Sequence, residues 1–277
     1  GAKFFGLIRS LVGIFLFGIQ TYFLSKILVY LIRIFIYLID NSLLEREIFL
    51  TFFMGLNLID WISILLVIIF QTALFSVGIQ YSKKIINYSA IIVYTGMILF
   101  FFVVLLSDVK TSSTAFMQIL SFKNFLDINN FAPLLTVAGT IFAYFSIIIV
   151  SFGDYSRYVK HKEDLNKGNL SLILNLIIFS FFSMFIVIGS DAFLGQKFSN
   201  LDRIFTSPTD IIGKFDNIQV TIVVLLFIIV ASASTNLAAN YIPSQYSLIN
   251  FAPSKLSLRS ASYLISFCGL LIAIFWL

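Results

Sequence analysis

Residues 217–254 read NIQVTIVVLLFIIVASASTNLAANYIPSQYSLINFAPS, 38 residues without Asp, Glu, Lys or Arg. The first half is rich in Val, Ile and Leu, and about 20 apolar residues are enough to cross a bilayer core as an α-helix. The second half carries Asn240, Pro243 and other polar residues. The sequence therefore predicts one transmembrane helix at 218–240, which ends near Ala239 and is followed by a polar connection.

Similar charge-free stretches recur along the chain. They predict seven transmembrane helices, at residues 4–39, 59–81, 86–107, 131–152, 168–190, 218–240 and 260–277. The first is a long, tilted helix in which the Lys26 side chain can extend toward the membrane surface. Strands of a β-barrel would need alternating segments of about ten residues, which these continuous runs do not provide. The prediction is an all-α integral membrane protein in the lipid bilayer.

The composition excludes a water-soluble protein. The 277 residues are 60% hydrophobic and 11% charged, whereas soluble domains have roughly 25% charged residues. Although the net charge is +5, Lys and Arg never form a run longer than two, so we expect no nucleic-acid partner. One Cys and one His provide neither a disulfide framework nor a metal cluster.

The charges of the connecting segments predict an orientation. With the Gly1 end in the cytoplasm, the inner connections hold nine Lys and Arg residues and the outer ones six. Basic residues favour the cytoplasmic side of a membrane. We therefore expect a multi-pass protein of the plasma (inner) membrane with a cytoplasmic Gly1 end.

A polar cluster at the end of the 218–240 helix is the strongest candidate site. Ser234 and Thr235 lie three and four residues after Ala231, so the three residues share one helix face. If a local distortion exposes the Ala231 carbonyl, it and the two hydroxyls provide uncharged oxygen ligands for a hard cation such as Na⁺. Alternatively, the hydroxyls bond back to the preceding turn and the small residues allow close helix packing. The residues alone leave both interpretations open.

Three motifs together resemble the nucleobase–cation symporter-1 family, which includes hydantoin, cytosine, allantoin, uracil and purine permeases. They are Gly18-Ile-Gln-Thr-Tyr22, Gly153-Asp-Tyr-Ser-Arg-Tyr158 and Ser234-Thr-Asn-Leu-Ala-Ala-Asn240. The resemblance covers residues 1–277 as one transporter domain, the third to ninth of about twelve helices, without the first two and the last. It implies a LeuT-type fold of two inverted five-helix repeats. It also implies a monomer that takes up a small heterocycle, with Na⁺ or H⁺ as coupling ion and no other cofactor.

The resemblance implies roles for five residues. Ala231, Ser234 and Thr235 would form the eighth-helix half of a sodium site. Gln20 and Asn240 would hydrogen-bond the polar edge of a flat heterocycle, because amides both donate and accept. A buried amide without a partner costs a few kcal/mol, so direct pairing of these two amides is the alternative to ligand binding. If they bind ligand, alanine at either position should weaken binding and leave the ligand-free protein nearly as stable.

Aromatic stacking on the substrate is implied for Phe145, with Tyr144 beside it. The chain departs from the family at Leu16, where many members have Trp. Either another aromatic residue supplies a second face, or the substrate is held on one face only. The neighbouring candidates are Phe15, Phe17 and Tyr22.

Three other functions are weaker alternatives. A seven-helix receptor or retinal protein is disfavoured, since the last span lacks a Lys that could form a Schiff base. An intramembrane enzyme would need acid–base or metal-binding residues, which the charge-free spans lack, so we do not expect an enzyme. A LeuT-type symporter for another small solute is the third alternative.

Overall fold

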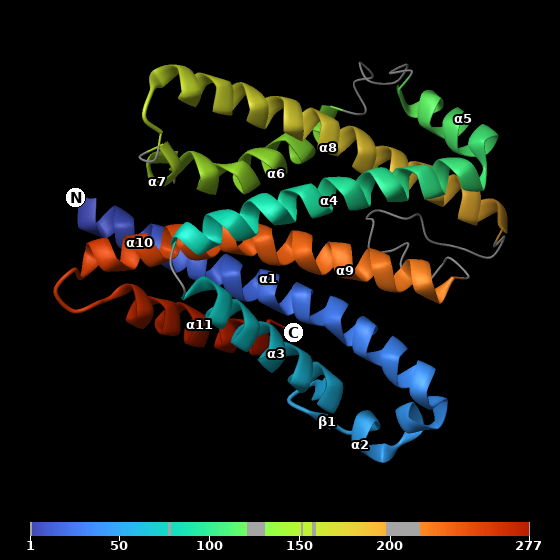
Figure 1. Ribbon diagram of the computed structural model, residues 1–277, viewed down its shortest axis with the longest axis horizontal. Helices are drawn as coiled ribbons and strands as arrows, with labels where there is room; N and C mark the ends of the chain where they lie inside the picture. Colours follow the sequence, from blue (N-terminus) through green and yellow to red (C-terminus); the bar gives the residue numbers. More distant parts are fainter. Residues whose placement is uncertain are drawn as a thin grey trace. The chain divides into compact units, whose positions relative to one another are not determined.

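The computed structural model is almost entirely helical (Figure 1). It describes residues 2–76, 79–120, 131–150, 152–156, 159–197 and 217–276. The α-helices are α1 (Ala2–Ile39), α2 (Glu47–Leu50), α3 (Leu58–Phe75), α4 (Ile79–Ser107), α5 (Val109–Leu120), α6 (Phe131–Val150), α7 (Phe152–Ser156), α8 (Lys162–Lys197), α9 (Ile218–Thr235), α10 (Ile242–Phe251) and α11 (Leu258–Phe275). The other elements are the 3₁₀-helix η1 (Asn41–Glu45), the strands β1 (Phe52–Phe53) and β2 (Leu56–Asn57), and the π-helix η4 (Asn236–Tyr241).

Several helices have the length and composition of membrane spans. Within the described residues, six are long and apolar enough to cross a bilayer: Phe4–Ile39, Leu58–Phe75, Lys83–Ser107, Lys162–Ala192, Ile218–Phe251 and Leu258–Phe275. The protein is therefore a multi-pass membrane protein. The span expected at 131–152 falls on α6, in which Leu134–Ala143 is the described apolar part, so the number seven stays a prediction.

The helix that begins at Ile218 does not end near Ala239, so that prediction is wrong. α9 continues through η4 into α10 and ends at Phe251. Ser244 and Gln245, which suggested a polar connection, are buried and paired: Ser244 Oγ donates to the Asn240 carbonyl (2.6 Å), and Gln245 Nε2 donates to the Ser262 hydroxyl (2.6 Å). Pro243 closely follows the π-helix η4, near the start of the α10 segment.

The connection between α1 and α3 adds one β-hairpin to the expected all-α fold. Phe52 pairs with Asn57 and Phe53 with Leu56 in antiparallel register. The turn residues Met54 and Gly55 both have positive φ, 53° and 78°, which is the geometry of a type I′ hairpin turn. The expected spans also shift: α3 ends at Phe75 rather than residue 81, and α8 extends on both sides of 168–190.

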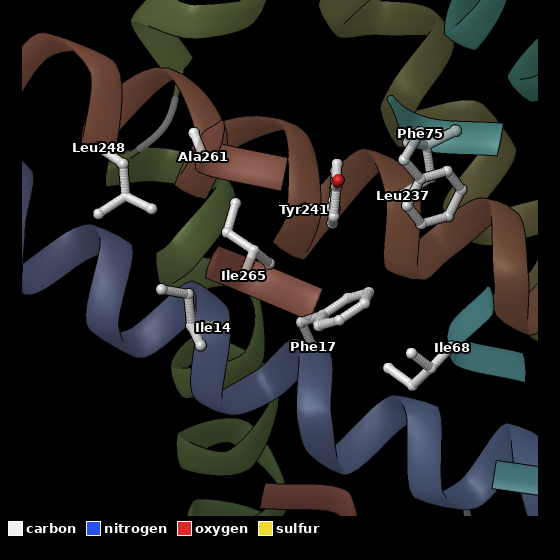
Figure 2. Packing of buried hydrophobic residues seen from close by; sticks show 9 residues of the cluster. All are labelled: Ile14, Phe17, Ile68, Phe75, Leu237, Tyr241, Leu248, Ala261 and Ile265. Atoms are coloured by element: carbon white, nitrogen blue, oxygen red, sulfur yellow. The ribbon is translucent and has the colours of Figure 1, made fainter. Parts of the chain in front are cut away.

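The chain divides into two compact units, residues 1–93 with 225–277, and residues 94–224. In the first, α1 packs against α3, α10 and α11. Figure 2 shows its apolar core, which comprises Ile14, Phe17, Ile68, Phe75, Leu237, Tyr241, Leu248, Ala261 and Ile265. The core of the second comprises Val104, Phe116, Phe185 and Ile186.

Two glycines allow α1 and α11 to approach closely. A Cβ atom on Gly18 would lie 2.6 Å from Ile272 Cβ and 2.9 Å from the Gly269 carbonyl oxygen. A Cβ atom on Gly269 would lie 2.5 Å from Phe17 Cδ1. Helices in lipid associate mainly through van der Waals packing, which small interfacial residues permit. The first glycine of the Gly18–Tyr22 motif therefore has a packing role.

Lys26 of α1 forms an ion pair with α3. Its Nζ lies 3.0 Å from Asp60 Oδ1 and 5.1 Å from the centre of the Tyr22 ring. Asp60 also helps to cap the N-terminus of α3, because its Oδ2 accepts the Asn57 N–H (3.1 Å) in a capping box. The Asp60 carboxylate therefore stabilises the Lys26 ammonium.

The Asp60→Asn variant is expected to lower the free energy of unfolding by about 1 kcal/mol. The asparagine amide leaves Lys26 without its counter-ion. The pair is partly exposed, at 33% for the Lys26 side chain and 8% for that of Asp60. The loss of stability is therefore closer to that for a surface ion pair than to that for a buried one. Melting of the purified protein in detergent measures the change. The Lys26→Met variant combined with Asp60→Asn should recover part of it; strictly additive losses would contradict the pairing.

Candidate functional site

Gln20 of α1 and Asn240 of η4 contact each other directly. Asn240 Nδ2 donates to Gln20 Oε1 at 2.8 Å, and Gln20 Nε2 donates to the Ser232 carbonyl at 3.2 Å. Asn240 is buried and Gln20 is half-buried. The fold thus brings together two amides separated by 220 positions, in the direct pair that the sequence leaves as an alternative to ligand binding.

A third amide, Asn236, completes this cluster. It is fully buried, and its Oδ1 accepts the second N–H of Asn240 at 2.9 Å. Its Nδ2 donates to the Phe17 carbonyl and to the Thr21 hydroxyl, both at 3.3 Å. Asn236 was not among the residues predicted from the sequence. It precedes Asn240 by four residues in the same motif, the spacing of side-chain neighbours on a helix, and this spacing was a usable signal.

The π-helix η4 positions these two asparagines. Its geometry is seen at its end, where the Ile242 N–H bonds to the Leu237 carbonyl five residues earlier. Single π-turns within α-helices are rare and frequently occur at functional sites. The helix distortion thus lies at Asn236–Tyr241, one turn beyond the regular α-helix that contains Ala231.

The three candidate cation ligands lie together in the last turns of α9. Ser234 Oγ donates to the Ala231 carbonyl at 3.0 Å, and Thr235 Oγ1 donates to the same carbonyl at 2.9 Å. The hydroxyls therefore bond back to the preceding turn, as in the structural alternative. The same bonds hold three uncharged oxygens on one helix face, a donor set that fits a hard cation. Thr235 is exposed and Ser234 half-buried.

The aromatic candidates receive less support. Tyr144 and Phe145 belong to α6, and their side chains lie outside the described residues. Phe17 cannot replace the missing Trp at Leu16, because it is fully buried against Tyr241, with ring centroids 5.4 Å apart. The other two neighbours also have partners: Tyr22 has Lys26 over its ring, and Phe15 meets Trp276 edge-on.

An apolar cavity of about 260 Å³ lies between α1, α3 and α9. Its walls are hydrocarbon, from side chains such as Leu24, Phe70 and Ile229. An apolar wall cannot satisfy the donors and acceptors of a heterocycle. The amide cluster is therefore the better candidate for the polar edge of a substrate.

Of the Gly153–Tyr158 motif, the residues up to Ser156 lie in α7, and Arg157 and Tyr158 lie outside the described residues.

These features define a multi-pass membrane protein with a candidate site of neutral amides and hydroxyls. Residues 1–277 match the family of permeases for cytosine/purines, uracil, thiamine and allantoin. The chain belongs to this family, which confirms the family predicted from the three motifs.

Curated relatives include two permeases. The allantoin permease of Bacillus subtilis (strain 168) is 23% identical over 141 residues, which are 50% of this chain and 27% of that protein. The purine-uracil permease NCS1 of Arabidopsis thaliana is 21% identical over 128 residues, 46% of this chain and 20% of that protein. The chain thus spans about a quarter of the length of the curated relatives it matches. No solved structure matches it significantly.

Proposed function

We propose that the whole protein carries out cation-coupled uptake of a nucleobase or related heterocycle, such as uracil, cytosine, a purine, allantoin or hydantoin. The observation that carries this proposal is the cluster of Gln20, Asn236 and Asn240, three amides among apolar helices of a permease-family chain. Flat heterocycles present neutral donors and acceptors along their edges, and amides match such edges in pairs. The protein would act as a monomer in the plasma membrane, in a LeuT-type fold, with a cytoplasmic Gly1 end.

An uptake panel tests this function. Cells that express the whole protein are supplied with labelled uracil, cytosine, allantoin, hydantoin or a purine, and we expect one of these compounds to accumulate above the level of cells without the protein. Amino acids serve as the comparison, because other LeuT-type symporters would transport unrelated small solutes. Background uptake of every heterocycle together with uptake of an amino acid would overturn the proposal.

We also propose that the Ala231 carbonyl and the Ser234 and Thr235 hydroxyls contribute ligands to a Na⁺ site. Support comes from the three oxygens on one helix face, joined by bonds of 2.9 and 3.0 Å. Rotation of each hydroxyl would turn its lone pairs toward a cation, since the hydroxyl proton is free to reorient. Proton coupling is the alternative, with a purely structural role for the three residues.

The Thr235→Ala variant is expected to raise the Na⁺ concentration for half-maximal uptake roughly tenfold, because one ligand worth about 1.4 kcal/mol is lost. Substrate affinity at saturating Na⁺ should change much less. A sodium titration of uptake measures both. Thr221→Ala is the matched control, since Thr221 bonds back to the Asn217 carbonyl in the same helix. If the Na⁺ concentration for half-maximal uptake is unchanged in Thr235→Ala, Thr235 is not a Na⁺ ligand.

A further inference from the structure

Five polar side chains form one hydrogen-bonded chain, the amide relay. It runs from Gln71 of α3 through Thr21 of α1 and Asn236 and Asn240 of η4 to Gln20 of α1. The first three side chains are 0% exposed and Asn240 is 5% exposed. The relay therefore links three helical elements, and four of its five side chains are buried.

Two backbone carbonyls set the direction of the relay. A carbonyl only accepts hydrogen bonds, so the Phe17 carbonyl selects the Nδ2 side of Asn236, and the Ser232 carbonyl selects the Nε2 side of Gln20. The oxygens of both amides are left to face Asn240. Asn240 then has to donate both of its N–H groups, at 2.9 Å and 2.8 Å.

Thr21 and Gln71 reinforce this direction from the other end. Thr21 donates its single hydroxyl proton to Gln71 Oε1 at 2.9 Å, so toward Asn236 it only accepts. Gln71 Nε2 is buried and has no hydrogen-bond partner among the described residues. A leucine at this position would avoid that unsatisfied group. The glutamine is explained if its oxygen is needed to orient Thr21.

Two polar groups of the relay remain available for a ligand. Asn240 has used both N–H groups, and its Oδ1 has no partner among the described residues. Gln20 has one N–H left after its bond to Ser232. We propose that Thr21, Asn236 and Gln71 are positioning residues that make the site present one acceptor, Asn240 Oδ1, beside one donor, the Gln20 amide.

This proposal rests on the proposed function and specifies the substrate edge. The complementary edge has an N–H donor next to an acceptor, as in the cis-amide of a cyclic ureide or lactam. An edge of two donors or two acceptors would leave one group of the site unpaired, which is unfavourable when the group is buried. The relay would therefore act as a specificity filter without touching the substrate.

The binding test uses the whole protein and compares variants by their discrimination between ligands. Uracil and hydantoin are each compared with their N-methyl derivatives, which lack one donor. The unmodified protein should bind at least one derivative tenfold or more weakly than the parent compound. Thr21→Val and Gln71→Leu should reduce this ratio to less than threefold, because the Phe17 carbonyl, at 3.3 Å, is then the one remaining group that fixes the orientation of the Asn236 amide, and Asn240 is held less firmly in its polarity. Thr21→Ser should preserve the ratio.

Thr72→Val is the matched control, because the Thr72 hydroxyl bonds to Ser266 across another contact of α3. It should leave the ratio unchanged. A purely structural role of Thr21 would weaken parent and derivative alike, so an unaltered ratio in Thr21→Val and Gln71→Leu would overturn the proposal.

Melting temperatures of the ligand-free protein provide a second test of the relay. The Thr21 and Asn240 side chains are linked through Asn236 and have no hydrogen bond to each other. The relay predicts that the melting temperature of the Thr21→Val/Asn240→Ala double variant falls by less than the sum of the two single decreases. Additive shifts would overturn the relay. If neither uracil nor hydantoin binds, these two compounds are not substrates, which counts against the proposed function. The melting temperatures of the single and double variants still test the relay in that case.

Discussion

The Asn240→Ala variant is expected to weaken binding of the transported heterocycle by about 10- to 100-fold. It removes the acceptor offered to the ligand, and it leaves Gln20 Oε1 and Asn236 Oδ1 without their donor. The second effect should also lower the free energy of unfolding of the ligand-free protein by about 1–3 kcal/mol. Equilibrium binding to the purified protein and melting in detergent measure the two changes.

Asn175→Ala is the control for this variant. Asn175 of α8 is exposed, and its amide donates to the Ser171 carbonyl and accepts from the Tyr94 hydroxyl, neither of which belongs to the amide relay. It should change neither binding nor the response to ligand. The stability loss expected for Asn240→Ala differs from the expectation based on sequence alone, because the structure pairs this amide with two others. Loss of stability with unchanged affinity would show that these amides serve only packing.

The bilayer explains why most of the helices could be predicted from the sequence. Each backbone group in the hydrocarbon must be paired within a helix, so long apolar runs specify helices with little ambiguity. Helix ends are less constrained, because tertiary contacts decide them. Gln245 looks like a loop residue in the sequence, yet the Ser262 hydroxyl and the Leu258 carbonyl satisfy it inside a helix pair.

The candidate site was only partly visible in the sequence for a similar reason. The motifs indicated Gln20 and Asn240, but spacing along the chain does not show which side chains meet across helices. Gln71 stands alone in an apolar helix, and this isolation was a usable signal, since a lone buried amide requires a partner or a purpose. Its partner, Thr21, lies 50 positions earlier, and only the fold reveals the pair.

The other large effect is expected for Gly18, two residues before Gln20. Its Cα lies against the backbone of α11, where an added Cβ would meet Ile272 Cβ at 2.6 Å and the Gly269 carbonyl oxygen at 2.9 Å. Real Cβ atoms do not approach other atoms this closely. Because the obstructing atoms belong to or adjoin the backbone, no side-chain rotation can make room for a methyl group. The two helices have to separate instead.

Gly18→Ala is therefore expected to lower the free energy of unfolding by about 2–3 kcal/mol, the upper part of the range for overpacked sites. Alanine is a better helix former than glycine by about 1 kcal/mol, so the packing loss has to exceed that gain. Gly139→Ala is the matched control: a Cβ on this glycine of α6 meets nothing within 4 Å, and the variant should be neutral or slightly stabilised. Movement of α1 would also shift Gln20 away from Asn240, so heterocycle binding should weaken in Gly18→Ala. Melting in detergent and equilibrium binding test both effects, and equal stabilities of the two glycine variants would contradict the close contact between α1 and α11.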